Sequence, residues 1–496
     1  MNPSDHLAAL QVVVLFLAAP IIVLLQARRL AWAATTLTSL LTFAIAIALT
    51  LGVLNGQDYQ YFMGSWPAPF GIELRVDGFS AVLLLAITGA SSAALLAGYH
   101  SLDQQIEAKR QPLFFAAWIL ALAGLAGIVI SADAFNIFVF MEISSLASYV
   151  LVAGGPDKRA LPAVFKYLIF GTIGATFYLI GVGLIYMMTG TLNLADMEVR
   201  IHDVADQSPV LVAAGFITVG LALKAALFPL HIWLPNSYTF APHVVTVFLA
   251  ACATKVSLYV LLRFDFFVFQ QNLTGHELQF TFFFMPLAVF AILIASAVAL
   301  FEKDLKRMLA WSSVAQIGYI VLGASIVSLA GLTASVLHVF NHAIAKGSLF
   351  LAVACLAMSF RGLRLNDIAG CAKAMPWTMG ALVLAGLSLI GVPGTAGFIS
   401  KWYLISAVLE LGGGIAIFLT AVIVIGSLMA VVYIWRIVEH AYFRPAETEI
   451  VAREAPLGIL SITWVVALAN LYFGINPELP VTLSELAADA LMGHIK

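Results

Sequence analysis

The sequence predicts an all-α polytopic membrane protein with about 14 transmembrane helices. Its 496 residues are 62% hydrophobic and only 10% charged, whereas about 25% of residues are charged in soluble domains. Mean hydropathy is +1.02, and the apolar residues gather in uncharged runs long enough to cross a bilayer. The hydrophilic stretches between these runs are too short to predict a separate soluble domain.

Fourteen apolar runs, taken in order, account for the predicted helices. They lie at residues 7–25, 31–53, 79–98, 112–131, 135–153, 162–188, 210–234, 243–269, 281–301, 308–328, 331–358, 376–410, 414–438 and 456–474. The first run is followed, not preceded, by Arg28 and Arg29, which is the reverse of a signal peptide, so we expect a retained span. The run at 376–410 is too long for one straight crossing and contains GVPGTAGF (Gly391–Phe398), which predicts a broken helix.

Loop charges predict that both termini lie outside. With that orientation the inner loops carry 15 of the 24 lysines and arginines: Arg28, Arg29, Lys109, Arg110, Lys158, Arg159, Lys303, Lys306, Arg307, Arg361, Arg364, Lys373, Arg436, Arg444 and Arg453. The outer segments carry three (Arg75, Arg200 and Lys496), and the other six fall within spans. Because loops on the inner side are enriched in lysine and arginine, this split favours N-out, C-out and an even number of helices.

Several classes of chemistry are disfavoured by the sequence. A net charge of −2 gives no reason to expect a nucleic-acid partner. Cys252, Cys355 and Cys371 lie far apart without a CxxC motif, so we expect no disulfide framework, zinc site or iron–sulfur site. Neither GxxxxGK[ST] nor a strand-linked GxGxxG occurs. We therefore expect no cofactor, and the energy for any transport must come from an ion gradient or a partner protein.

Prolines are predicted to break two of the spans. Pro229 falls in the seventh run and Pro235 directly follows it, and Pro393 falls in the twelfth. A proline cannot donate to the carbonyl four residues back, so Pro393 would free the carbonyl of Leu389. Free backbone groups at membrane depth are tolerated only beside protein or water. The breaks lie five helices apart, an odd offset that makes them run in opposite directions, as an inverted repeat requires.

Glu142, Lys224 and Lys255 lie deep within predicted spans. Each such residue costs about 2.5–3.5 kcal/mol at mid-bilayer, so each needs a partner or water. A pair that only locks helices together is the alternative for Glu142, and snorkelling is the alternative for Lys224. Since Lys224 falls about fifteen residues into its run, too deep to reach the interface easily, we predict proton-carrying or charge-coupling roles for all three.

The eleventh run places three ionisable residues on one helical face. His338, His342 and Lys346 are spaced at i, i+4 and i+8. Two histidines at this spacing could belong to a zinc site, but a lysine on the same stripe argues against a metal. A structural hydrogen-bond stripe and a proton relay remain, and we favour the relay because histidine titrates near working pH.

Five further ionisable residues receive separate interpretations. Lys401, after the break in the twelfth run, is predicted to join the proton pathway. Lys166 is better explained as a snorkelling lysine and Arg263 as an interfacial anchor. His231 and His243 could either line an inner water entrance or be structural.

A lysine in a wet cavity beside a carboxylate can act as a switch. If Glu142 approaches Lys224, the ammonium is stabilised. If Glu142 is drawn elsewhere, Lys224 can release its proton to Lys255. Placement in the sequence motivates this hypothesis.

Six motifs together resemble the antiporter-like subunit family of respiratory complex I, membrane-bound hydrogenases and Mrp-type sodium/proton antiporters. In order they are FNIFVFMEISSLASYVL, LKAALFPLHIWLPNSYTFAP, TKVSLYVLLR, DLKRMLAWSSVAQIGYI, HVFNHAIAKGSLF and PGTAGFISKW. The resemblance runs from about Asp77 to Phe443 and looks greatest for the D subunits of Mrp-type antiporters.

The resemblance implies a fold of fourteen core helices in which helices 4–8 and 9–13 form two inverted five-helix repeats. Residues 1–111 would then form an N-terminal three-helix region, 112–270 the first repeat, 281–440 the second repeat, and 441–496 the last helix with an outer tail. A proton path along the midplane is also implied. The family's glutamate–lysine pair falls on Glu142 and Lys224, its central lysine on Lys255, its helix-eleven histidine and lysine on His338 and Lys346, and its exit lysine on Lys401.

The implied function is proton translocation in a multisubunit monovalent cation (Na⁺)/H⁺ antiporter, with other membrane subunits as partners, in a bacterial or archaeal cell membrane. The alternative is a proton-pumping subunit of a complex I-type or hydrogenase-type assembly, where electron transfer in partner subunits supplies the energy. In either case we expect no catalytic chemistry in this chain itself. A purely structural scaffold is disfavoured by the ionisable residues within the spans.

Overall fold

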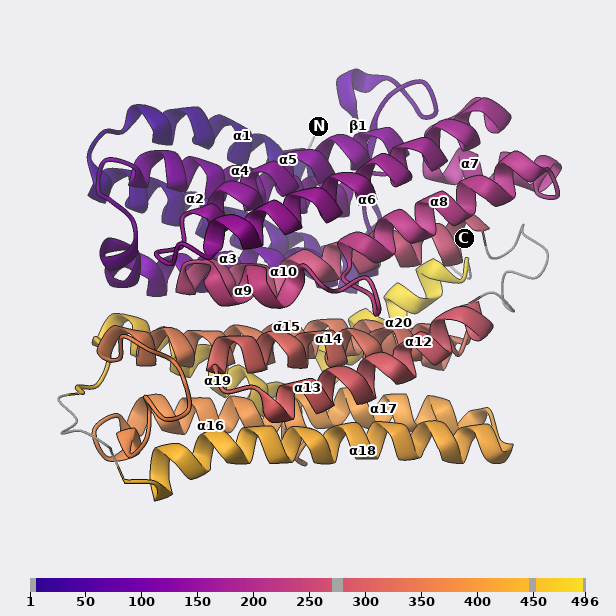
Figure 1. Ribbon diagram of the computed structural model, residues 1–496. Helices are drawn as coiled ribbons and strands as arrows, with labels where there is room; N and C mark the ends of the chain where they lie inside the picture. Colours follow the sequence, from indigo (N-terminus) through magenta and orange to yellow (C-terminus); the bar gives the residue numbers. More distant parts are fainter. Residues whose placement is uncertain (1–5, 270–279, 446–451, 494–496) are drawn as a thin grey trace.

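The computed structural model describes residues 6–269, 280–445 and 452–493. Its helices lie side by side in two stacked groups, with the first half of the chain in one and the second half in the other (Figure 1). α10 packs against α3 in its own group and against α15 in the other, and α9 packs against α14. The core of the molecule is therefore a seam between the two halves of the chain.

The first group contains, besides a hairpin described below, these helices: α1 Leu7–Leu24, α2 Arg28–Leu54, α3 Gly78–Gln105, α4 Gln111–Ile130, α5 Ala134–Ala153, α6 Ala160–Thr189, α7 Leu194–Ile201, α8 Ser208–Lys224, α9 Leu234–Phe240 and α10 His243–Leu262 with a π-helical extension Arg263–Phe269. The second group contains π-helical Phe280–Phe284, α12 Met285–Phe290, π-helical Ala291–Ala295, α13 Ser296–Phe301, α14 Leu305–Ala324, α15 Leu329–Ser359, α16 Pro376–Ile390, α17 Ala396–Glu410, α18 Gly413–Val438 with π-helical Glu439–Phe443, α19 Leu457–Ile475 and α20 Glu478–Leu491. Short 3₁₀ turns occur at Met63–Ser65, His202–Val204 and Cys371–Lys373.

Each predicted span coincides with a helix, a helix pair or a run of joined helical segments, which confirms the predicted fold class. Eleven of the described helices are long and apolar enough to cross a membrane. The other three predicted spans are α8 with the turns that follow it, α16 with α17, and α14. The first two are broken into short pieces, as the prolines predict. α14 is less apolar because it carries polar residues such as Ser312, Ser313 and Gln316, all of them buried.

Side chains from the sequence fix several helix starts. Asp133 accepts a hydrogen bond from the Asn136 amide at 2.7 Å and caps α5. Asp304 caps α14 by accepting from the Arg307 amide at 3.0 Å. Such caps satisfy amides that have no partner within the helix. They therefore set where the spans begin and the height of their ionisable residues.

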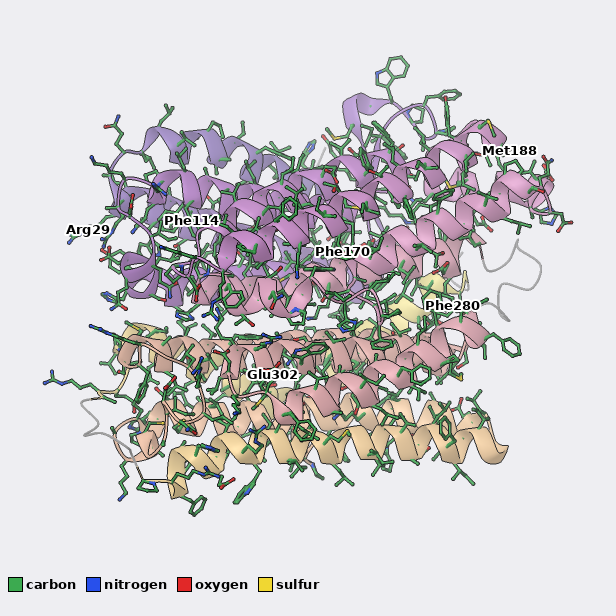
Figure 2. All side chains as sticks on the ribbon, viewed as in Figure 1. Arg29, Phe114, Phe170, Met188, Phe280 and Glu302 are labelled. Atoms are coloured by element: carbon green, nitrogen blue, oxygen red, sulfur yellow. The ribbon has the colours of Figure 1, made fainter. Side chains whose placement is uncertain are left out.

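The two ends of the bundle differ in composition. One end, which we call the basic end, carries the α1–α2, α3–α4, α5–α6 and α13–α14 links, with their arginines and lysines. The other, the hairpin end, carries α7 and the antiparallel strands β1 Tyr59–Phe62 and β2 Glu73–Val76. Figure 2 shows Arg29 at the basic end and Met188 at the opposite end. The start of α1, which contacts both strands, and the end of α20 lie toward the hairpin end (Figure 1).

Two elements were not predicted from the sequence. The hairpin adds a small two-stranded sheet to an otherwise helical fold. The segment expected to be an outer tail contains α20, whose apolar face packs on α3 and α15. A Cβ on Gly78 would lie 2.8 Å from the Cβ of Leu486, so a glycine is needed where α20 meets α3.

The prediction that Arg263 is an interfacial anchor is wrong. Its side chain is 11% exposed and pairs with Asp77, which is 13% exposed. Asp77 also caps α3 by accepting from the Ser80 amide at 3.0 Å, and the Arg263 Nε donates to the Tyr259 hydroxyl at 3.1 Å. A nearby carboxylate compensates the buried guanidinium, so this pair ties α10 to α3.

Candidate functional site

The first part of the site is formed by α5 and α8. Lys224 Nζ lies 3.9 Å from Glu142 Oε1, and the two side chains are 8% and 28% exposed. The ammonium donates a hydrogen bond to Ser145 Oγ at 2.8 Å, whereas Glu142 Oε1 has no hydrogen-bond partner among the described residues. The structure thus brings the predicted pair together as an ion pair without a direct hydrogen bond.

Lys224 stands at the end of α8, not in the middle of a span as the run of apolar residues suggested. After Lys224 the chain forms turns through residues 225–233 before α9 begins at Leu234. Pro229 lies within this break. Pro235 lies in the first turn of α9, where a proline loses no helical hydrogen bond. The prediction that Pro235 interrupts a helix, as Pro229 does, is therefore wrong.

The first break is closed by a tryptophan. Trp233 Nε1 donates to the Leu223 carbonyl at 2.9 Å, so an indole takes a carbonyl at the end of α8. A cavity of about 30 Å³ lies beside Lys224, lined among others by Ser144, Ser145, Ser148, Tyr167, Trp233 and Ser257. This volume holds at least one water molecule. Since Ser257 belongs to α10, the cavity reaches from Lys224 toward the helix of Lys255.

Lys255 lies near the seam between the two groups of helices. It is 1% exposed, and its ammonium donates to the carbonyl of Ala250 in the same helix. Coulombic interactions link Lys255 to His342 and Lys346 of α15. The central lysine therefore lies between the first half and the histidine–lysine stripe of the second half.

The stripe on α15 faces inward along its whole length. His338 Nδ1 is 2.9 Å from Ser400 Oγ, and its Nε2 is 2.9 Å from Gln316 Oε1. Because the amide oxygen only accepts, Nε2 carries a hydrogen and Nδ1 of a neutral ring accepts from Ser400. The His342 ring lies 6.1 Å from that of His338, and neither of its nitrogens has a hydrogen-bond partner in the described chain.

Lys346, two turns beyond His338, is anchored to α14. Its Nζ donates to the Leu309 carbonyl at 2.7 Å and also to Ser312 Oγ. Neutral oxygens thus hold the ammonium, so its proton is not tied to a carboxylate.

The second break contains Lys401. α16 ends at Ile390, α17 begins at Ala396, and Pro393 lies between them. Lys401 Nζ donates to the carbonyls of Leu389 at 3.1 Å and Ile390 at 2.8 Å, and to Ser427 Oγ at 3.0 Å. The carbonyl that Pro393 was expected to free is therefore satisfied by the lysine.

A glycine makes this geometry accessible. Gly391 has φ +92°, in the left-handed region that favours glycine. A Cβ at this position would lie 2.9 Å from Lys401 Cδ. The backbone and the lysine therefore approach closely where the helix is interrupted.

The neutral partners of the lysines were missed from the sequence, although their positions carried a signal. Ser145 lies three residues after Glu142 and so shares its helical face. Ser312 lies in the WSS stretch of the fourth motif, and Ser400, the partner of His338, directly precedes Lys401. Lys166, in contrast, is exposed on α6, consistent with the snorkelling interpretation.

Fold and site together define a polytopic membrane protein with a line of buried ionisable side chains across its middle. Residues 131–429 match the family model described as NADH:quinone oxidoreductase/Mrp antiporter, transmembrane. The chain is also 43% identical over 412 residues, 83% of its own length and 80% of the relative, to NADH-quinone oxidoreductase subunit N of Desulforudis audaxviator. The chain belongs to the NADH:quinone oxidoreductase/Mrp antiporter family.

Other similar proteins include an antiporter subunit and chains of two membrane complexes. The Na⁺/H⁺ antiporter D subunit of Bacillus subtilis is 28% identical over 441 residues, covering 88% of this chain and 86% of that one. A chain of the membrane-bound sulfane sulfur reductase, an archaeal respiratory membrane complex, superimposes with a TM-score of 0.91 at 29% identity, covering 98% of each chain. A chain of the Mrp complex from Dietzia gives a TM-score of 0.90 at 25% identity, covering 100% of this chain and 98% of that one.

Proposed function

We propose that this chain is the proton-translocating subunit of a multisubunit monovalent cation (Na⁺)/H⁺ antiporter. The observation that carries the proposal is a line of four buried lysines, Lys224, Lys255, Lys346 and Lys401, held mainly by hydroxyls and carbonyls. The similarity to the D subunit of an Na⁺/H⁺ antiporter and to a chain of an Mrp complex supports it. Since both relatives are parts of larger assemblies, other membrane subunits are the partners.

Proton transfer along this line begins at Lys224. While Glu142 stays near, its charge stabilises the Lys224 ammonium. When Glu142 moves away, the ammonium gives its proton through water in the adjoining cavity to the amine of Lys255. Lys224 becomes neutral and Lys255 becomes charged, so one proton has advanced by one site.

The second half carries the proton onward. His342 lies between Lys255 and Lys346 in the network of Coulombic interactions, and its two unpartnered nitrogens suit a group that accepts and releases protons. His338 connects through Ser400 toward Lys401. Lys401, beside the second break, is the last lysine of the line and its exit group.

We further infer that residues 112–270 and 281–440 are inverted repeats. One break lies in each, at residues 225–233 and 391–395, and a buried lysine stands beside each break. Interrupted helices in matching halves are typical of inverted-repeat transporters. The basic end is assigned to the inner face by its loop charges, which puts both termini on the outer face of a bacterial or archaeal cell membrane.

A second candidate function is proton pumping driven by electron transfer in partner subunits. It is favoured by the 43% identity to a subunit of an NADH-quinone oxidoreductase. Purifying the native assembly and identifying its subunits separates the two. Small antiporter-type membrane subunits alone support the first function, and iron–sulfur or hydrogenase-like subunits support the second.

The test of the proposed function is proton flux in vesicles that contain the full assembly. Lys224→Ala is expected to abolish sodium-dependent proton movement over a range of sodium concentrations and pH. Lys166→Ala removes an exposed lysine from α6 and serves as the control, with flux expected to stay at the level of the unchanged protein. Undiminished flux in Lys224→Ala would refute the proposal.

A further inference from the structure

Lys306 is a buried lysine that the pathway described above does not use. The sequence pattern placed it among the cations of an inner loop, which is wrong. It is the second residue of α14 and is 3% exposed. Its neighbours behave differently: Lys303 is exposed, and Arg307 turns outward to pair with Glu302 at 3.0 Å. Lys306 alone of these three cations points into the protein at the basic end.

The ammonium of Lys306 reaches across the seam to the first half of the chain. Its Nζ donates to the carbonyl of Ala241 at 2.7 Å, between α9 and α10. The described residues provide no carboxylate that forms an ion pair with it, although Asp304 is near enough for a Coulombic interaction. Burying a cation that is held by one neutral carbonyl costs free energy. We therefore expect Lys306 to have a functional role.

α14 leads from Lys306 directly to the relay. One turn further along, the Leu309 carbonyl accepts hydrogen bonds from Lys346 Nζ at 2.7 Å and from Ser313 Oγ at 3.1 Å. Three residues of α-helix span about 4.5 Å along the axis. Lys306 thus projects from one turn of α14, and the next turn of the same helix holds Lys346, with serine hydroxyls beside it.

The same seam contains polar groups suited to ordered water. Coulombic interaction links His243 at the start of α10 to Lys306, and the His231 ring lies 5.1 Å from that of Trp311 on α14. The Nδ1 atoms of both histidines and the Trp311 Nε1 are buried without a hydrogen-bond partner in the described chain. Buried polar atoms of this kind are commonly satisfied by water, which fits the inner water entrance considered from the sequence.

We propose that Lys306 is a further proton-carrying residue, which exchanges protons between water at the basic end and Lys346. The proposal rests on the proposed function, because it adds an access point to the same proton pathway. In the inward direction the Lys306 ammonium gives its proton through water to the neutral amine of Lys346. Lys346 becomes charged, Lys306 becomes neutral, and a proton from water at the basic end restores the Lys306 ammonium.

The competing role is a clamp in which Lys306 only holds the two halves together. Lys306→Arg separates the roles, because arginine keeps the positive charge and the donor but does not release its proton. In vesicles containing the full assembly, we expect proton flux in Lys306→Arg to fall on the order of 100-fold, as for loss of an acid–base group. Lys306→His, which can titrate, should keep a measurable fraction of the flux. Lys303→Arg is the matched exposed control and should behave as the unchanged protein.

Measuring assembly, and using a second variant if needed, separates a loss of proton transfer from a loss of structure. The yield and thermal stability of the purified complex should be unchanged in Lys306→Arg. If arginine prevents assembly, Lys306→Gln replaces it, since an amide also donates to the Ala241 carbonyl but carries no transferable proton. Full flux in the assembled arginine or glutamine variant would overturn the proposal.

Lys346→Arg distinguishes a failure of this inference from a failure of the proposed function. If Lys346→Arg abolishes flux while Lys306→Arg does not, the pathway stands and Lys306 is only a clamp. If neither substitution changes flux, protons do not pass through this line of residues, and the proposed function fails with the inference.

Discussion

The two broken helices differ in which side chain donates hydrogen bonds to the backbone carbonyls beside the break. At the first break Trp233 donates to the Leu223 carbonyl, which also accepts from the Ala226 amide at 3.2 Å, and Lys224 is left facing Ser145 and the carboxylate of Glu142. At the second break Lys401 itself satisfies the carbonyls of Leu389 and Ile390. At the first break, therefore, Trp233 bonds to the backbone carbonyl and Lys224 carries the charge. At the second break, Lys401 does both.

The difference has consequences for how each lysine responds to its surroundings. At 3.9 Å, a full charge attracts the Lys224 ammonium by about 4 kcal/mol at an effective dielectric constant of 20. Glu142 can therefore change the state of Lys224 by moving. The carbonyls around Lys401 belong to the backbone of the break and cannot be withdrawn without unfolding it. Lys224 is suited to being switched, and Lys401 to receiving a proton at a fixed position.

The largest expected effect comes from removing the switch. Glu142→Ala should abolish ion-coupled transport, with a loss on the order of 100-fold or more, because Lys224 then lacks the charge that controls it. The amount of assembled complex should not change. Flux measurements on vesicles check this, with Glu107→Ala as a control for an exposed glutamate at the basic end. Transport at the normal rate in Glu142→Ala would mean that the first break does not hold a switch.

Replacing each lysine by methionine tests whether the two tasks are separate. Lys224→Met should lower transport but leave thermal stability nearly unchanged, because Trp233 still closes the break. Lys401→Met should lower both, because the buried carbonyl of Leu389 loses its donor, at a cost of about 1–3 kcal/mol, and the part-buried carbonyl of Ile390 loses the same donor. Thermal unfolding of the purified complex, measured beside proton flux, checks the difference. Equal stability of the two variants would contradict the comparison.

Trp233→Phe tests the contribution of the indole hydrogen bond at the first break. Phenylalanine keeps a ring to stack on Tyr167, whose ring lies 4.3 Å away, but cannot donate to the Leu223 carbonyl. Because that carbonyl keeps the Ala226 amide as a donor at 3.2 Å, stability should fall by only about 0.5–1.5 kcal/mol. Transport by the assembled protein should stay within about threefold of normal, a change of about 0.6 kcal/mol in the barrier. A loss of transport as deep as that of Lys224→Met would show that the indole belongs to the proton path.

The sequence was sufficient for features that depend on local chemistry. Apolar length predicted the spans, and Pro393 predicted the free Leu389 carbonyl that Lys401 takes up. The sequence was insufficient for features that depend on contacts between distant parts of the chain. Lys306 follows a loop of charged residues, yet it is buried and bonded to the Ala241 carbonyl of the other half. Similarly, α8 ends at Lys224 because the chain folds back so that Trp233 meets Leu223, which apolar periodicity cannot reveal. α20 was missed because a helix with one apolar face lacks the uniform hydropathy of a span.

Effects on transport smaller than those of the lysine variants should come from the serine beside each of the two lysines at the breaks. Ser145 is the only described hydrogen-bond acceptor of Lys224, whereas Ser427 is one of three for Lys401. A hydrogen bond to a charged group contributes about 1.5–3 kcal/mol, and less where other acceptors remain. Ser145→Ala should therefore lower proton flux by roughly tenfold, equivalent to about 1.4 kcal/mol, and Ser427→Ala by less than about threefold. If Ser427→Ala proved the more damaging, the hydroxyl of Ser427 would be an exit for the proton itself, and the carbonyls of the second break would only position Lys401 beside it.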